Sequence, residues 1–273
     1  MEISSKNNEK IMELRKSVKD KSLIVLDTPK LINEAISRGV TPKAILATKK
    51  FENQFENSIT VTDSIIKLFS SVETSPGIIA LIEHNKQALR PPNGTFLILD
   101  TVQDPGNVGT LLRSAQGAGF NDVYLINCAS ITNNKVVRSA MGATFTLNLF
   151  EMQRNDFIKF AKENSLNLIM ADMDGKDIFE EPITSKNAGL VLGNEGSGVS
   201  DDIAALCKSS IKIPMQNNLE SLNVAISGSI IMFQISYGGN KKWVDIASGI
   251  ILKEQKKNQM HKKAKFSQKL EES

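Results

Sequence analysis

Histidine and cysteine are scarce in this chain of 273 residues, which holds only two of each. His84 and His261 lie outside the glycine-rich stretches described below, which argues against a zinc site or a histidine-activated nucleophile. Cys128 and Cys207 show no CxxC or Cys/His spacing, so we interpret them as small buried apolar residues. We expect no metal, and any catalysis must use arginine, glutamate, serine, asparagine and backbone groups.

Long apolar runs are also lacking. No stretch approaches the roughly 20 consecutive apolar residues that a membrane span needs. Residues 1–16 are polar and of mixed charge, without the apolar segment of a secretory signal. We therefore expect a cytoplasmic protein without a membrane partner. Apolar residues still make up 41% of the chain, which is enough to form the core of one large or two ordinary domains.

Positive charge is concentrated near the end of the sequence. Residues 240–273 hold nine lysines and four acids, although the net charge of the whole chain is only +3. Two interpretations stay open for this lysine-rich tail. It could attract RNA phosphates non-specifically, or it could be a solvated, frayed end, and we favour the second.

Short apolar runs alternate with amphipathic stretches in the first part of the chain, which indicates a small α/β domain over residues 1–84. The predicted strands are 22–27, 44–49, 58–62 and 77–83, and the predicted helices are 4–20, 29–37 and 63–70. A polar stretch with a Pro-Pro pair follows. We assign residues 85–94 to a linker.

Continuous apolar runs define a second domain over residues 95–239, and runs of this kind are typical of a parallel sheet covered on both faces. Its predicted strands are 95–100, 122–127, 166–172, 189–193 and 209–214. Its predicted helices are 107–119, 135–141, 156–163, 199–207 and 222–237. The fold class is therefore α/β, with two domains and a tail from residue 240.

Three glycine-rich stretches follow predicted strands of the second domain, where open α/β sheets build ligand sites. They are DPGNVGTLLRSAQGAGF (104–120), LVLGNEGSGVS (190–200) and IPMQNNLESLNVAISGS (213–229). The first lacks the G-x-G-x-x-G of a dinucleotide site, and the second lacks the Lys-Ser/Thr ending of a P-loop. Neither common phosphate motif explains them.

The polar side chains in these stretches each have a structural and a functional interpretation. Asn107 could cap a helix or contact a ligand, and Arg113 could lie on the surface or point into the same crevice. Glu195 stands among glycines and could be merely solvated. Ser221 could cap the last helix, whereas Asn223, in the first turn, is less easily explained by capping.

Together the three stretches resemble the signature of the SpoU (TrmH) family of RNA 2′-O-ribose methyltransferases, in the SPOUT superfamily. The first resembles D-P-x-N-x-G with an arginine in the next helix, the second L-G-x-E-G-x-G, and the third I-P-M followed by S-L-N-V. The resemblance covers residues 96–237. Residues 1–84 are similar, more loosely, to the L30e-like RNA-binding domain often fused to this family, through TPKLINEAISRGV and SPGIIALIE.

The resemblance implies a trefoil-knotted C-terminal domain, a homodimer, and S-adenosyl-L-methionine as the donor of a methyl group to an RNA ribose 2′-hydroxyl. The cofactor contacts that it implies are Leu192, Gly193, Asn194, Gly196, Ile213, Met215 and Leu222. The catalytic positions that it implies are Arg113, Asn107, Glu195, Ser221 and Asn223.

Arg113 is the central catalytic residue that the resemblance implies. An arginine stays protonated at neutral pH, so we expect Arg113 to position a phosphate or ribose and to stabilise negative charge on the reacting oxygen. Glu195, Ser221 and Asn223 are expected to orient Arg113 and the ribose. Asn107 is expected to contact the substrate or to shape its own loop.

Several alternatives stay open. Ribosomal RNA is favoured over transfer RNA, because the N-terminal domain is appended. A catalytically inactive RNA-binding adapter could use the same fold. A nicotinamide-dependent dehydrogenase on an ordinary doubly wound sheet is the alternative from another class, and the missing glycine fingerprint argues against it.

Overall fold

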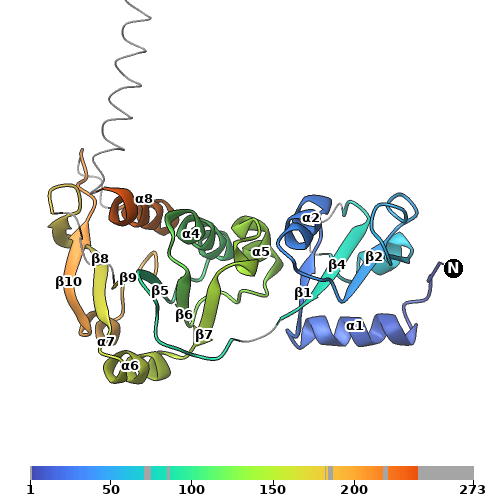
Figure 1. The fold of residues 1–273 in the computed structure, drawn as a ribbon, viewed down its shortest axis with the longest axis horizontal. Helices are drawn as coiled ribbons and strands as arrows, with labels where there is room; N and C mark the ends of the chain where they lie inside the picture. The colour runs from blue at the N-terminus through green and yellow to red at the C-terminus, as the bar shows by residue number, and fades with distance from the viewer. Residues whose placement is uncertain are drawn as a thin grey trace, which may run out of the picture.

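The computed structural model describes residues 2–70, 75–84, 87–181, 183, 187–217 and 221–238, and these residues form two separate sheets (Figure 1). The predicted lysine-rich tail lies outside the described residues. The first sheet has the strand order β1-β4-β2-β3, and the second has the order β10-β8-β9-β5-β6-β7. The predicted α/β fold class is confirmed, and the domain boundaries stay predictions.

The N-terminal domain is a mixed sheet covered on both faces. Antiparallel pairing joins β4 to both β1 and β2, and β3 adds to β2 in parallel. Alternate strand residues therefore enter two cores, Leu23 and Val25 on the side of α1 and α3, and Ile24 and Leu26 on the side of α2. The elements are α1 (Glu9–Lys19), β1 (Leu23–Leu26), α2 (Pro29–Ser37), β2 (Ala44–Ala47), β3 (Ile59–Thr60), α3 (Asp63–Ile66) and β4 (Ile78–Glu83).

The C-terminal domain is a six-stranded sheet in which every pairing is parallel. Helices α4, α5 and α8 cover one face, and α6 and α7 cover the other (Figure 1). The elements are β5 (Phe96–Asp100), α4 (Pro105–Ala118), β6 (Asp122–Ile126), α5 (Asn134–Ala140), β7 (Asn148–Met152), α6 (Arg154–Glu163), β8 (Asn167–Asp177), β9 (Ala188–Leu192), α7 (Asp201–Ala204), β10 (Cys207–Lys212) and α8 (Val224–Tyr237).

Several boundaries differ from the sequence prediction. The first helix begins at Glu9 rather than near residue 4, because the Asn8 side chain accepts the N–H groups of Lys10 and Ile11. Strand β8 extends to Asp177 instead of ending at 172. The helix predicted over 199–207 shrinks to α7, and Cys207 instead begins β10, which pairs with β8.

Strand β7 was not predicted at all. Only Leu149 and Phe150 are buried among its five residues, so its sequence lacks the continuous apolar run of the central strands. It lies at the edge of the sheet and pairs on one side with β6. An edge position needs fewer apolar residues, which explains why the pattern gave no signal.

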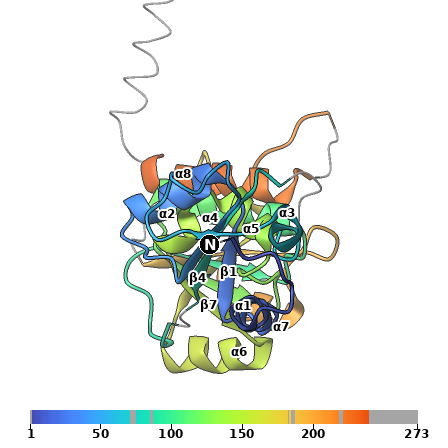
Figure 2. The ribbon, with the colours of Figure 1, turned by 90° about the vertical axis from the view of Figure 1, so that its right-hand side faces the viewer.

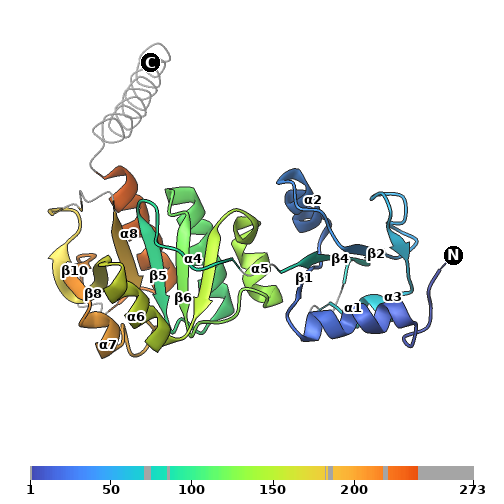
Figure 3. The ribbon, with the colours of Figure 1, turned by 60° about the horizontal axis from the view of Figure 1, so that its bottom comes forward.

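Helix α5 lies between the two domains (Figure 3). Val136 packs into the core of the C-terminal domain, whereas Val137 packs into the core of the N-terminal domain. The next residue, Arg138, donates from Nη1 to Asp27 Oδ2 at 3.2 Å. Consecutive side chains of one short helix therefore pack against both domains. Figure 2 shows the C-terminal domain directly behind the N-terminal one.

The Asp27 carboxylate, at the end of β1, is almost completely buried at this contact. Its Oδ1 atom has no hydrogen-bond partner within the described part of the chain. Burial raises the pKa of Asp27, and the Arg138 guanidinium opposes that rise. The ion pair therefore fixes how the domains meet more than it adds to stability.

The second half of the predicted linker is bound to the C-terminal domain. Buried Asp122 accepts two hydrogen bonds from Arg90, at 2.6 and 3.2 Å, and one from the backbone N–H of Asn93 at 2.8 Å. It also accepts from Asn148 Nδ2 at 2.8 Å, and the Tyr124 hydroxyl donates to the Arg90 carbonyl. Residues 90–93 are therefore part of the C-terminal fold rather than a free connector.

Among the helices that the structure describes, none combines the length and apolar character needed to cross a bilayer.

Gly109 sets the approach of α4 to α5. A Cβ added there would lie 2.5 Å from Ser139 Cβ and 2.5 Å from the Val136 carbonyl oxygen. We predict that Gly109→Ala lowers the free energy of unfolding by about 1–3 kcal/mol in urea titrations, because the helices must separate. The matched control is Gly117→Ala in the same helix, where the added group meets only the end of Phe233 and improves helix propensity. Equal effects of the two substitutions would contradict this account.

Candidate functional site

The carboxyl ends of β5 and β9 form the floor of the site, because these strands are neighbours in the sheet. Asp100 ends β5 with a fully buried carboxylate. Its Oδ2 accepts the N–H and the hydroxyl of Ser200 at 2.8 and 2.6 Å, and its Oδ1 lies 3.4 Å from an Arg154 nitrogen. Asp100 thus fastens the second glycine-rich stretch to the first strand. It was not among the predicted site residues, although a charge ending an apolar run was a usable signal.

The loop after β9 is a tight turn closed by its own backbone. Asn194 and Gly198 exchange hydrogen bonds at 2.9 and 3.0 Å, and Gly198 has a φ of +69°. The backbone of Gly193 lies so close to Gly198 that a side chain at Gly193 would collide with it. These glycines are therefore required by the shape of the turn itself.

The Asn194 side chain, which was predicted to bind the cofactor, is used within the loop. Its Nδ2 donates to the Thr101 carbonyl at 3.0 Å, and its Oδ1 accepts from Gly196 N at 2.9 Å and Ser197 N at 3.2 Å. Its backbone N–H is paired with the Gly198 carbonyl, so Asn194 can offer a ligand only the second lone pair of its own carbonyl oxygen. Thr101 has a φ of +57°, so the end of β5 bends sharply to meet the turn.

Asn107 joins the three glycine-rich stretches. Its Nδ2 donates to Glu195 Oε1 at 2.7 Å, and its Oδ1 accepts from Asn223 Nδ2 at 3.1 Å. Residues 88 and 116 positions apart in the chain are therefore linked through one amide. The convergence of the three stretches that the sequence suggested is present. We call Asn107, Glu195 and Asn223 the amide cluster; Glu195 and Asn223 are exposed to solvent, and Asn107 is half-buried.

The helix caps differ from the prediction. Asp104, not Asn107, caps α4, because its Oδ1 accepts the Asn107 N–H at 2.9 Å. Asn223, not Ser221, caps α8, because its Oδ1 accepts from the N–H groups of Ala225 and Ile226. The interpretation of Asn223 as a residue of the first turn was therefore wrong. The helix begins at Val224, two residues later than its apolar pattern suggested.

Helix α8 brings the third stretch onto the second. Gly228 packs directly on Leu192, at the end of β9, and on Leu111 of α4. The hydroxyls of Ser114 and Ser229 lie 2.7 Å apart, and the Ser236 hydroxyl donates to the carbonyl of Ala118. These close contacts fix the start of α8, and hence Asn223, beside the end of β9.

The remaining predicted residues differ in their exposure. Leu192 is buried, Gly193, Ile213, Met215 and Leu222 are half-buried, and Gly196 and Ser221 are exposed. Arg113 lies exposed on α4, two turns after Gly106. Its guanidinium forms no hydrogen bond or ion pair with any described residue of the chain, so the structure does not join it to Glu195 or Asn223.

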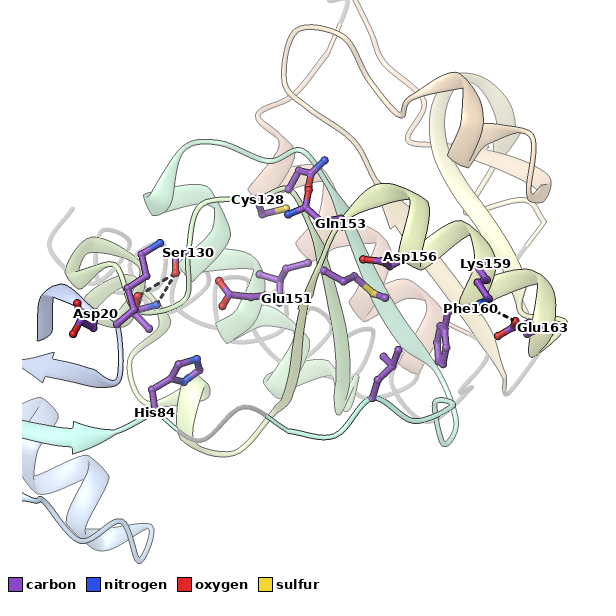
Figure 4. Close-up of a pocket in the computed structure, with 16 residues that line it drawn as sticks. Asp20, His84, Cys128, Ser130, Glu151, Gln153, Asp156, Lys159, Phe160 and Glu163 are labelled. Carbon is purple, nitrogen blue, oxygen red and sulfur yellow. Dashed lines mark hydrogen bonds and ion pairs between the residues drawn. The ribbon is translucent and has the colours of Figure 1, made fainter. Parts of the chain in front are cut away.

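A cavity of about 840 Å³ lies apart from the amide cluster, between β7, α6 and the N-terminal domain (Figure 4). It contains none of the predicted site residues, and it is lined by the carboxylates of Asp20, Glu151, Asp156 and Glu163. Of these, Glu151 Oε1 accepts the backbone N–H of Ile131 at 3.0 Å. The cavity is thus chemically unlike the amide cluster.

Neither cysteine offers a reactive thiolate. Both are free and half-buried, and burial raises the pKa of Cys128 to about 12 and that of Cys207 to about 11. Across the described ranges, no group of three or more histidine, cysteine, aspartate or glutamate side chains could hold a metal ion.

Comparison with known proteins gives consistent results. Residues 94–233 match the SpoU rRNA Methylase family. The chain is 26% identical over 244 residues to the 23S rRNA (guanosine(2553)-2′-O)-methyltransferase RlmP of Bacillus subtilis, a match covering 86% of this chain and 98% of the relative.

Two solved structures share the fold. One is an AdoMet-bound rRNA methyltransferase from Sinorhizobium meliloti, with a TM-score of 0.74, 22% identity, and coverage of 86% of this chain and 97% of that one. The other is the SpoU methyltransferase AviRb from Streptomyces viridochromogenes, with a TM-score of 0.70, 20% identity, and coverage of 84% and 97%.

The two functions of Asn223 are separable. We predict that Asn223→Ala lowers the free energy of unfolding by about 1 kcal/mol, because α8 loses its cap. Asn223→Asp keeps the capping oxygen but loses the donor to Asn107, so its stability in urea titrations should stay within a few tenths of a kcal/mol of the wild-type value. A loss in Asn223→Asp as large as in Asn223→Ala would show that the bond to Asn107 dominates.

Asp104 should titrate abnormally. The Lys135 ammonium, 3.0 Å away, and the Asn107 N–H hold the pKa of this carboxyl below its ordinary value of 3.8. The ionised carboxylate therefore stabilises the fold above that pH, and the contribution is lost as the pH falls through the depressed pKa. We predict that Lys135→Ala raises the NMR titration midpoint of Asp104. Lys176→Ala, which removes a distant ion pair, should leave it unchanged.

Proposed function

Because this chain belongs to the SpoU rRNA Methylase family, we propose that it transfers a methyl group from S-adenosyl-L-methionine to a ribose 2′-hydroxyl of RNA, with ribosomal RNA as substrate. The observation that carries the proposal is the amide cluster of Asn107, Glu195 and Asn223, which joins the three family stretches at one edge of the sheet. The Bacillus subtilis relative, named for 23S rRNA, supports ribosomal over transfer RNA. We place the reaction in the cytoplasm.

The residues at this edge suit the proposed cofactor. Ile213, Met215 and Leu222 offer half-buried apolar side chains of the kind that an adenine and a thioether contact. Gly193 offers backbone groups without a side chain in the way, and Asn194, whose side chain and N–H are used within the turn, offers its carbonyl oxygen. Leu192 and Gly196 complete the proposed set. An AdoMet-bound structure of the same fold is consistent with this assignment.

S-adenosyl-L-methionine supplies a methyl group already activated by a positively charged sulfur. The protein must hold the 2′-oxygen in line with it, and such positioning can contribute roughly 7–11 kcal/mol. We assign Arg113 to the phosphate or ribose and to charge developing on the oxygen, since a guanidinium is a permanent cation. Its lack of partners in the described chain leaves all its donors available. Glu195, Ser221 and Asn223 orient the substrate beside it, and Asn107 shapes the loop between them.

We further propose a homodimer formed through α8. Three large apolar side chains on this helix, Ile226, Phe233 and Tyr237, are 53%, 44% and 36% exposed. Phe233 and Tyr237 stack on each other on this surface. A second copy of the chain would remove them from water, which favours association.

A trefoil knot is part of the same proposal. After β10, at the far edge of the sheet, the chain returns to place α8 against β9 and α4. This return beside the central strands supports the threading of the C-terminal segment that the family resemblance implies. The family match leaves no support for the dehydrogenase alternative.

The proposed function is tested by comparing ribose-methylation maps of ribosomal RNA from cells with and without this gene. We expect one methylated ribose to disappear and to be restored when the purified protein and S-adenosyl-L-methionine are added. Loss of a methylated ribose in transfer RNA instead would identify transfer RNA as the substrate. No loss in either RNA would favour the inactive adapter.

The role of Arg113 makes a sharper prediction. Arg113→Ala and Arg113→Lys should both lower the single-turnover methylation rate at least 100-fold, because a lysine lacks the bidentate grip of a guanidinium. Cofactor binding measured by calorimetry should stay within about 3-fold of wild type in both variants. Retention of most of the rate in Arg113→Lys would contradict the positioning role.

A further inference from the structure

A second groove, of about 510 Å³, lies where the end of α1 meets the segment 130–138. Four cations line it, Lys19 and Lys21 from the N-terminal domain and Lys135 and Arg138 from α5, and no carboxylate does. We call it the basic groove. Its other lining groups are mostly uncharged polar side chains, including Thr132. It is therefore built from both domains, and Lys19 and Lys21 give it positive charge beyond that of Lys135 and Arg138, which are paired with Asp104 and Asp27.

The basic groove is linked to the site already described through Lys135. Lys135 donates from Nζ to Asp104 Oδ2 at 3.0 Å, and Asp104 caps the helix that carries Asn107 and Arg113. One side of the groove therefore contacts the start of the helix that carries the proposed catalytic arginine. This adjacency favours the RNA substrate itself over an unrelated anionic partner.

The larger cavity beside it has the opposite character. It shares Lys21, Ser130 and Thr132 with the basic groove, but its four carboxylates outnumber its two lysines, Lys21 and Lys159. The carboxylates of the larger cavity repel a phosphate backbone, whereas the cations of the basic groove attract it. The charges thus direct a nucleic acid along one of the two hollows that meet at Lys21.

Lys21 is held in an unfavourable backbone conformation. It follows the last residues of α1 with a φ of +58°, where glycine or asparagine is the usual choice. Its ammonium, like that of Lys19, has no ion-pair partner within the described ranges. A strained position that keeps a lysine is a reason to look for a function of the side chain.

We infer that Lys19 and Lys21, together with Lys135 and Arg138, form a phosphate-binding groove that holds the RNA substrate across the two domains. The inference rests on the proposed function. It adds the surface along which the RNA backbone would approach Arg113. Arg138 is also bound to Asp27, so the contact between the domains places this cation in the groove.

The test uses the full chain and ribosomal RNA from cells lacking this gene. One phosphate contact contributes about 0.7–0.9 to the slope of log affinity against log salt, which corresponds to about 5–8-fold in affinity at 0.1 M salt. We expect Lys19→Ala and Lys21→Gly each to weaken RNA binding by that factor, and the double variant to lower the slope by about 1.4–1.8. Cofactor binding should not change.

Lys21→Gly separates binding from folding. Glycine relieves the positive φ, so the urea midpoint of this variant should stay equal or rise while its RNA affinity falls. The charge-matched control is Lys10→Ala, which removes an exposed lysine nine residues before Lys19 on the same helix and should keep the wild-type affinity and slope.

Two results would overturn the inference. One is a double variant with wild-type RNA affinity and slope while the wild-type protein methylates this RNA, which would leave the proposed function intact. The other is unchanged RNA binding with lost binding to vesicles of anionic lipid, which would assign the groove to a membrane. Failure of the wild-type protein itself to bind or methylate ribosomal RNA would instead count against the proposed function.

Discussion

One asparagine amide, that of Asn107, links the three glycine-rich stretches on which the site depends. It donates to Glu195 and accepts from Asn223, so one side chain contacts both of the other stretches, which the packing of Gly228 on Leu192 also brings together. An asparagine is one of the few side chains that can do both at once, since it carries a donor and an acceptor on one rigid plane. The buried Asp100 carboxylate beneath it fixes Ser200, and thus one end of the loop that carries Glu195.

The contact between the domains likewise depends on a few neighbouring residues. Val136 and Val137 are adjacent in the chain but belong to different cores, and Arg138 adds a buried ion pair next to them. Helix α5 therefore packs into the cores of both domains. Displacement of the N-terminal domain would disturb the helix that also carries Lys135, and through Lys135 the cap of α4. The placement of RNA and the shape of the site are coupled through one short helix.

The sequence was sufficient for the parts of the fold that depend on burial. Five of the six parallel strands were predicted, and the four inner ones coincide with apolar runs. The three glycine-rich stretches indicated both the carboxyl edge of the sheet and the family. Edge strand β7 was missed, because a strand with one neighbour needs little apolar sequence. The caps were misassigned because Asp104 and Asn107, or Ser221 and Asn223, are equally good capping residues, and only the start of the helix decides between them.

The tertiary partners in the site were beyond what the pattern could give. The residues around Asn194 do not indicate that its side chain bonds to Thr101 and Gly196. Likewise, the sequence near Asp100 does not indicate its bond to Ser200, one hundred residues later. These bonds depend on the order of strands in the sheet, which brings β5 beside β9 only after the chain has formed three other strands.

The buried Asp122 carboxylate determines where the chain can be divided. Its ligands include Arg90 and the Asn93 backbone, which precede the first strand of the C-terminal sheet. A fragment cut at residue 95 would keep this carboxylate in the interior and discard the guanidinium that neutralises it, at a substantial cost in stability. Exchange of the N-terminal domain between relatives would therefore succeed at a crossover before Arg90, so the unit that can be recombined is longer than the sheet it contains.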